Sequence, residues 1–172
     1  MLAQTLLPDV VIVQIDHVGR GAAHTRNAAL ASVSTEWVAF LDDDDLWLPQ
    51  HLQALMAVSA GADLVYSWFT VLNGYDPLTV DGRSPFGQPW SPALAAAIQS
   101  ANFIPVTVLA RTAALRAVGG FTPPPWASAD NPCEDWGCWL KLLDAGAVFR
   151  HLPQRTWQWR THAGQSAGRP WH

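Results

Sequence analysis

Four consecutive aspartates, Asp42 to Asp45, directly follow a short apolar run, Trp37 to Leu41. An apolar run of that length is typical of a buried strand. The adjacent carboxylates repel one another, and none is buried cheaply without a partner. A divalent cation would hold them together, and open α/β sheets bind ligands beyond the carboxyl ends of their strands. The pattern therefore predicts a cation site at a strand end. The alternative is a solvated, Asp-rich turn that caps the following helix.

The spacing within this cluster suggests different roles for its members. Asp42 and Asp44 are two residues apart, so they point the same way if the backbone is extended. A hard cation held by few protein carboxylates takes other oxygens, typically from substrate phosphates, which suggests a nucleotide diphosphate. Asp45 lies just before Leu46 and has a second interpretation as the cap of the next helix.

The composition favours a single folded domain. The chain has 172 residues, of which 49% are hydrophobic and 14% charged, enough for a core. A net charge of −4 argues against nucleic-acid binding through broad phosphate neutralisation. Cys133 and Cys138 lack a CxxC spacing and are interpreted as reduced thiols of a cytoplasmic protein. No apolar run is long enough for a transmembrane segment, and no signal peptide is recognised.

The apolar patterns predict an α/β domain with a mostly parallel central sheet flanked by helices, and small antiparallel additions near the C-terminus. Residues 1–7 suggest the tail of a helix. The expected strands are 10–15, 36–41, 63–71, 104–110, 147–152 and 156–160. The expected helices are 22–32, 48–60, 91–101, 111–118 and 132–145. Two stretches without periodicity, 73–90 and 121–131, are expected to be loops that select the ligand.

The helix over 132–145 has the clearest local signals. Asn131 is a good N-terminal cap, Pro132 suits the first position, and Glu134 completes a capping box. Asp135 falls in the first turn, where the helix dipole favours the ionised carboxylate. That position would keep Asp135 deprotonated while lowering its pKa and its strength as a base.

Four motifs occur in an order that resembles the family 2 glycosyltransferases of the GT-A fold. They are the acidic run after Phe40-Leu41, the preceding Thr25-Arg26-Asn27, the later Glu134-Asp135, and Trp159-Arg160-Thr161-His162. The resemblance spans residues 16–165. It implies a single GT-A (Rossmann-like) domain over 1–172, with a nucleotide-sugar half at about 1–72 and an acceptor half at about 73–172. Set against that family's pattern, the resemblance implies that the chain lacks the first β-strand.

The resemblance also implies roles for individual residues. By the resemblance, Asp44 and His162 would ligate the metal ion, which is Mn²⁺ or Mg²⁺. The catalytic base falls to Asp135 or Glu134, and Asp135 is preferred because Glu134 also fits the capping box. The donor contacts fall to Asp16, Arg26, Asp42 and Asp43.

Each role has a plainer alternative. Asp16 would otherwise be a loop cap and Arg26 an exposed helix arginine. Arg160 either neutralises leaving-group charge or pairs with an acid. A histidine near a polar tail, such as His162, is usually just exposed to solvent.

The function that the resemblance implies is metal-dependent transfer of a sugar from a UDP-, GDP- or dTDP-linked donor to an acceptor hydroxyl, with inversion. Two other hypotheses stay open: a sugar-phosphate nucleotidyltransferase and a non-catalytic nucleotide- or sugar-binding remnant. The chain has ten tryptophans. Trp47, Trp90 and Trp126, in loops or at a helix entry, are candidates for stacking on sugar rings, whereas Trp136 and Trp139 are expected in the core.

Overall fold

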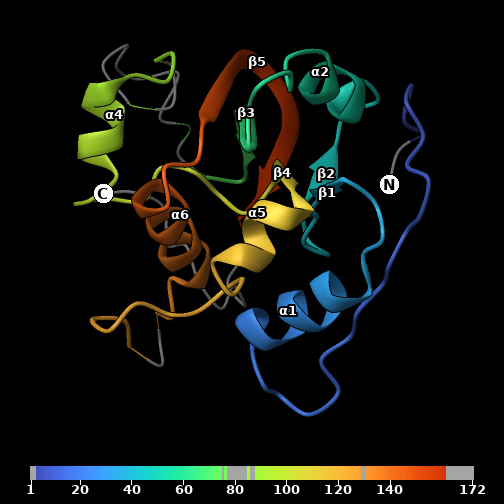
Figure 1. The fold of residues 1–172 in the computed structure, drawn as a ribbon. Coiled ribbons are helices and arrows are strands. Elements are labelled where there is room, and N and C mark those ends of the chain that lie inside the picture. Colours follow the sequence, from blue (N-terminus) through green and yellow to red (C-terminus); the bar gives the residue numbers. More distant parts are fainter. Residues whose placement is uncertain (1–2, 75, 77–84, 86–87, 129–130, 162–172) are drawn as a thin grey trace.

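A mixed five-stranded sheet lies at the centre of the molecule (Figure 1). The computed structural model describes residues 3–74, 76, 85, 88–128 and 131–161. The strands are β1 (Trp37–Ala39), β2 (Leu46–Trp47), β3 (Leu64–Leu72), β4 (Val108–Arg111) and β5 (Phe149–Arg160). The helices are α1 (Ala22–Ser32), α2 (His51–Ala57), α4 (Pro92–Ala97), α5 (Thr112–Ala117) and α6 (Glu134–Asp144).

The strand order is β1-β4-β3-β5-β2. The long central strands β3 and β5 pair in parallel, from Leu64 opposite Phe149 to Leu72 opposite Arg160. The other three pairs, β1–β4, β3–β4 and β2–β5, are antiparallel. The domain is thus of the expected α/β class, but the sheet is mixed among the described strands rather than mostly parallel.

Successive side chains of β3 pack on opposite faces of the sheet, as the pleat requires. Leu64 belongs to the main apolar cluster, which also takes in Leu30 of α1, Leu115 of α5 and Trp139 of α6. Val65 belongs to a smaller cluster, which includes a leucine of α2. The helices α1, α5 and α6 therefore share one core, and they come together near the site described below.

Several expected elements are confirmed. The helix over 22–32 is present as α1 with the same bounds, and β3 matches the strand expected over 63–71. The strands over 36–41 and 104–110 and the helices over 48–60, 91–101 and 111–118 are present but shorter. The two last strands form one continuous strand, β5, and β2 was not expected.

The N-terminal expectations are wrong. Residues 3–7 form no helix, and the run over 10–15 forms no strand. Val10, Val11, Val13 and Ile15 are each more than half exposed. Figure 1 shows this segment (dark blue) passing beside the molecule without joining the sheet. Its β-branched composition fits a strand, but the segment makes no ladder hydrogen bonds to the described strands.

The expected capping box on α6 is also wrong. The helix begins two residues later than expected, at Glu134, with Cys133 at the cap in a left-handed conformation (φ 48°) and no side-chain cap hydrogen bond. Glu134 instead forms a long-range ion pair, described below. Among the described residues, no helix is long and apolar enough to cross a membrane.

Candidate active site

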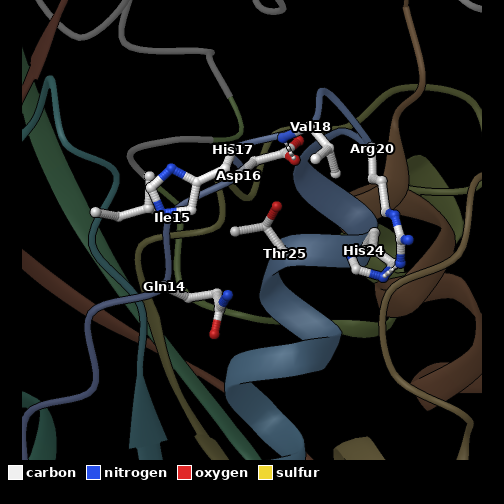
Figure 2. Close-up of a pocket in the computed structure, with 8 residues that line it drawn as sticks. All are labelled: Gln14, Ile15, Asp16, His17, Val18, Arg20, His24 and Thr25. Atoms are coloured by element: carbon white, nitrogen blue, oxygen red, sulfur yellow. Dashed lines mark hydrogen bonds between the residues drawn. The ribbon is translucent and has the colours of Figure 1, made fainter.

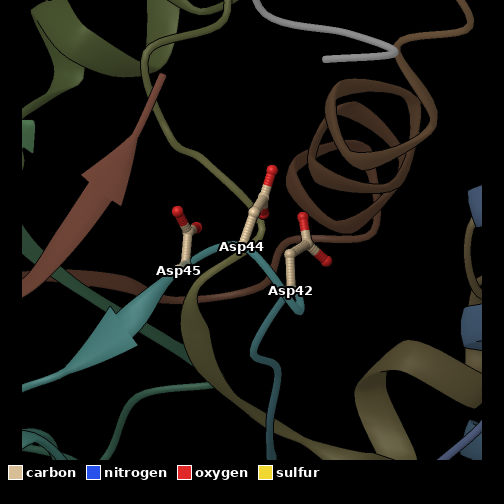
Figure 3. Close-up of side chains that lie close together, drawn as sticks. All are labelled: Asp42, Asp44 and Asp45. Atoms are coloured by element: carbon tan, nitrogen blue, oxygen red, sulfur yellow. The ribbon is translucent and has the colours of Figure 1, made fainter. Parts of the chain in front are cut away.

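A tight turn after β1 gathers three of the four aspartates. The backbone N–H of Asp45 donates to the carbonyl of Asp42 at 3.2 Å, which closes the turn over Asp43 and Asp44. Carboxylate oxygens of Asp42, Asp44 and Asp45 all lie within 4.8 Å of one another (Figure 3). The turn, rather than the expected extended backbone, brings Asp42 and Asp44 together. Asp43 is exposed at the turn.

Asp45 is the buried member of this acidic turn, 8% exposed. Its carboxylate accepts a hydrogen bond of 3.1 Å from the backbone N–H of Arg160 at the end of β5. Burial raises the pKa of Asp45 to about 7, against the effect of that backbone bond and with a further rise from Asp44. Asp45 is followed by β2 and not by a helix, so the expectation that it caps a helix is wrong.

Arg26 joins the acidic turn to helix α6. One guanidinium nitrogen donates to both carboxylate oxygens of Asp42, at 2.8 and 2.9 Å. A second nitrogen donates to Glu134. The Arg26 side chain is only 14% exposed and that of Glu134 only 8%, so water screens this pair weakly. The alternative that Arg26 is an exposed helix arginine is therefore wrong. Its guanidinium is already bound by two carboxylates.

Helix α1 is fixed in the position that this contact requires. Directly after Arg26, Asn27 exchanges two hydrogen bonds with the backbone of Phe121, at 2.7 and 2.8 Å. The neighbouring Gly120 has a φ of 67°, and a Cβ there would come within 2.3 Å of the Asn27 side chain. Asn27 therefore holds the start of the loop that leads into α6.

Asp135 follows Glu134 in the first turn of α6 and is held by two donors. The backbone N–H of Trp136 donates to one carboxylate oxygen at 2.7 Å. The side-chain amide of Asn102 donates to the other at 3.2 Å. Asn102 is held in turn, since its side-chain oxygen accepts from the backbone N–H of Ile104 at 3.1 Å. The sequence analysis did not predict a role for Asn102. The one sequence signal for it is that asparagine often bonds the backbone two residues on, as Asn102 does with Ile104.

The pKa of Asp135 is raised to about 6, contrary to the expectation that the helix dipole would lower it. Burial is the main cause, and the negative charge of Glu134 adds to it. The hydrogen bonds from Trp136 and Asn102 and the charge of Arg26 act in the other direction. A carboxylate with such a pKa is a stronger base than an ordinary aspartate and is still ionised at neutral pH.

Asp16 lies in a different setting, in the loop before α1. Its carboxylate accepts from the backbone N–H groups of Val18, at 3.3 Å, and Gly21, at 2.7 Å, so it organises its own loop. Backbone N–H groups of the loop, first that of Arg20 and then that of Gly21, lower the pKa of Asp16. Asp16 also lines an open cavity of about 180 Å³, with Arg20, His24 and others at its wall (Figure 2).

The remaining expected site residues are only partly described. His162 lies outside the described residues. Arg160 ends β5 with its side chain exposed, and its backbone contacts Asp45. The structure therefore brings together Arg26, Asp42, Asp44, Asp45, Glu134 and Asp135, which come from α1, the turn after β1, and α6.

The acidic turn fits a hard divalent cation. It offers carboxylate oxygens alone, with no sulfur or nitrogen ligand among the three gathered residues. Mg²⁺ and Mn²⁺ prefer such ligands and take further oxygens from substrate phosphates. Burial is the main cause of the raised pKa of Asp45, and the negative charges of Asp44 and Asp42 add to it; a cation would neutralise those charges.

Comparison with known families and curated proteins gives consistent matches. The family model described as "Glycosyl transferase family 2" matches residues 2–117. An uncharacterized glycosyltransferase, alr2836, of Nostoc sp. is 36% identical over 122 residues, which are 67% of this chain and 37% of that protein. The pre-mycofactocin glycosyltransferase of Mycobacterium tuberculosis is 28% identical over 156 residues, 84% of this chain and 31% of that protein. The chain thus spans about a third of the length of the curated relatives it matches.

Solved structures share the fold. S. aureus TarS 1–349 in complex with UDP-GlcNAc has a TM-score of 0.65 and 22% identity, covering 85% of this chain and 40% of that chain. The complex of TarS 1–349 with UDP has a TM-score of 0.57 and 21% identity, covering 81% and 40%. This likeness confirms the fold that the four sequence motifs implied.

Proposed function

The chain belongs to glycosyl transferase family 2, and we propose that it transfers a sugar from a nucleotide-sugar donor to an acceptor hydroxyl with inversion. Two kinds of observation support this activity. The acidic turn and the proposed base Asp135 are linked through Arg26 and Glu134 within one site. Solved structures that share this fold include TarS complexes with UDP-GlcNAc and UDP, so a UDP-linked donor is the first to test. GDP- and dTDP-linked donors are the other candidates.

Asp44 would hold a divalent cation, Mn²⁺ or Mg²⁺, together with other oxygens of the acidic turn; His162 is a further candidate ligand. Such a cation neutralises charge on a departing nucleotide diphosphate. The buried Asp45 would keep the turn closed through its bond to the backbone of Arg160. The exposed side chain of Arg160 is a candidate for contact with the leaving group.

Asp135 would act as general base. It removes the proton of the acceptor hydroxyl as that oxygen bonds to the anomeric carbon. The bond from the anomeric carbon to the diphosphate oxygen breaks, and its electron pair leaves with the nucleotide. Attack from the face opposite the leaving group inverts the anomeric carbon. Asn102 and the backbone of Trp136 fix the carboxylate that receives the proton.

The donor contacts belong to the same proposal. Asp42 and Asp43 would contact the donor from the acidic turn, and Asp16 would contact its base at the cavity before α1. Arg26 would position Asp42 for the ribose through its two hydrogen bonds. In this division residues 1–72 supply the nucleotide-sugar half and residues 73–172 the acceptor half. A cytoplasmic location, which the cysteine usage favours, is also part of the proposal.

The observation that carries the proposal is the partly buried Asp135, held by two donors beside an ion pair that leads to the acidic turn. The test is release of UDP and formation of glycoside from UDP-GlcNAc with Mn²⁺ and a panel of sugar acceptors. Asp135→Asn keeps the volume and should lower turnover by about 10²–10⁴-fold. Asp44→Ala should abolish the Mn²⁺-dependent transfer. Asp144→Asn, at the other end of α6, is the matched control and should keep wild-type turnover.

Product stereochemistry, read from the anomeric coupling constant in proton NMR, tests inversion. Wild-type turnover in Asp135→Asn would exclude Asp135 as the base. Nucleotide binding by calorimetry without any transfer would favour the non-catalytic hypothesis.

A further inference from the structure

Trp126 differs from the other tryptophans considered for sugar stacking. Trp47 is buried, with its ring 4.7 Å from that of His51. Trp90 is partly buried and packs against the apolar core, with its ring centroid 5.0 Å from that of Phe149. Trp126 is 54% exposed, the one large aromatic side chain found exposed among the described residues. An indole that is kept on the surface is available to a ligand.

The loop that carries Trp126 is anchored tightly to α6. A Cβ at Gly137 would come within 2.3 Å of the backbone oxygen of Thr122 and 3.0 Å of Pro124. This spacing means that the loop backbone lies directly against the helix at a position where only glycine fits. The backbone N–H of Ala127 also donates to the carbonyl of Pro124 at 3.0 Å, which closes a turn around the tryptophan.

The anchored loop sets Trp126 against Trp136, the residue that follows the proposed base. Its ring packs edge-on against Trp136, with centroids 4.4 Å apart. Trp136 is fixed from both ends: its indole N–H donates to the carbonyl of Ile98 at 2.7 Å, and its backbone N–H donates to Asp135. The exposed indole and the carboxylate Asp135 are thus connected by a single, rigidly held residue.

We propose that Trp126 is the stacking platform for the acceptor, and that the acceptor presents a sugar ring there. The proposal rests on the proposed function of Asp135. One face of a pyranose carries C–H groups, whose positive ends are attracted to the negative face of an indole. A ring lying on Trp126 would have its hydroxyls at its edge, and one of them could reach Asp135. The acceptor class is therefore a glycoside, and the attacking group is a ring hydroxyl.

Binding can be measured without turnover. The whole chain is labelled with 5-fluorotryptophan, and its ¹⁹F NMR spectrum is recorded with methyl pyranosides of glucose, galactose, mannose and N-acetylglucosamine, in both anomeric forms. Loss of one signal in Trp126→Phe assigns the Trp126 resonance. We expect that resonance to shift with at least one glycoside and not with glycerol. The proposal is overturned if every glycoside leaves it unmoved, or if glycerol moves it equally.

Kinetics with UDP-GlcNAc and the best-binding glycoside give the second test. Trp126→Ala should raise the KM for the glycoside by between about threefold and tenfold, with a smaller rise in Trp126→Phe. Val148→Ala is the matched control, since Val148 is also exposed but lies beyond the other end of α6. The thermal midpoint of Trp126→Ala should stay near that of the wild type, because the side chain is mostly exposed.

The two readouts separate the two proposals. If the Trp126 resonance shifts with a glycoside but the protein transfers no sugar, the proposed function is contradicted, while glycoside binding at Trp126 is still supported. Transfer with an unchanged glycoside KM in Trp126→Ala would contradict the platform alone.

Discussion

Arg26 is the residue on which the site's internal geometry depends. It is mostly buried, and it compensates two carboxylates that come from different elements, Asp42 and Glu134. A buried carboxylate left without its partner is strongly destabilising, so Arg26 fixes the acidic turn and α6 relative to each other. The planar fork of arginine can serve two acids at once, which the single ammonium of a lysine does less well.

The same charge bears on the proposed base. Arg26 lowers the pKa of Asp135, while burial and Glu134 raise it to about 6. A base works only when ionised, so kcat/KM should rise with pH through about 6 and level off above it. In Arg26→Gln the lowering influence is absent, and the rising limb should move to higher pH.

The measurement is a pH profile of kcat/KM with UDP-GlcNAc, Mn²⁺ and a glycoside. Arg116→Gln is the control, because Arg116 is also bound, but to backbone carbonyls of the α1 region. If kcat/KM rises over the same pH range in wild type and Arg26→Gln, then Arg26 has no electrostatic effect on the group that titrates.

At the scale of single residues, the sequence predicts which residues belong to the site better than it predicts their contacts. The four motifs select Arg26, Asp42 and Glu134, and the structure does bring these together. The contacts of Glu134 and Asp45 could not be predicted, because local capping rules compete with partners far along the chain. Glu134 binds Arg26, 108 residues away, and Asp45 accepts from the backbone of Arg160, 115 residues away.

At the scale of elements, the segment over 10–15 shows where pattern alone fails. A run of β-branched residues is typical of a strand, but a strand also needs a neighbour for its hydrogen bonds. Helices α1 and α6 need only local bonds and a face on the core, and their positions were predicted closely. The sheet order could not be predicted either, since the pairing of β3 with β5 joins residues about 85 apart.

A substitution at Val13 tests whether the 10–15 segment contributes to the folded core. It is 78% exposed, so Val13→Lys should change the free energy of unfolding by no more than about 0.5 kcal/mol. The added charge on an exposed extended apolar segment should also lower aggregation. Both are measured by urea unfolding and light scattering on heating.

The matched control is Val65→Ala, at a fully buried valine of β3, which should lose roughly 1–3 kcal/mol. A loss of several kcal/mol in Val13→Lys would mean that the segment is buried after all.

At the scale of the whole molecule, a buried polar chain connects α2 to both central strands. The ring of His51 is fully buried and lies 2.7 Å from the hydroxyl of Thr156 in β5. That hydroxyl lies 2.6 Å from the hydroxyl of Ser67 in β3. Burial lowers the pKa of His51 to about 3. The chain therefore makes the folded state depend on a neutral histidine.

The sign of the pH effect follows from proton uptake. In the unfolded chain His51 binds a proton below about pH 6.5, but in the folded protein it does so only below about 3. Between these values the unfolded state binds the extra proton, so stability is lost as the pH falls. The slope from this one group approaches about 1.4 kcal/mol per pH unit. Carboxyls with raised pKa values, such as Asp135, act in the opposite direction, so the wild-type curve alone does not isolate the histidine.

A difference measurement isolates it. His51→Gln can keep a hydrogen bond to Thr156 and does not titrate. Urea unfolding of wild type and variant at several pH values from about 7.5 to about 4.5 should show the wild type losing stability relative to the variant as the pH falls below about 6.5. His24→Gln, at an exposed position of α1, is the control and should track the wild type. Parallel curves for wild type and His51→Gln would show that His51 takes up its proton equally in both states, and that the buried chain does not hold it neutral.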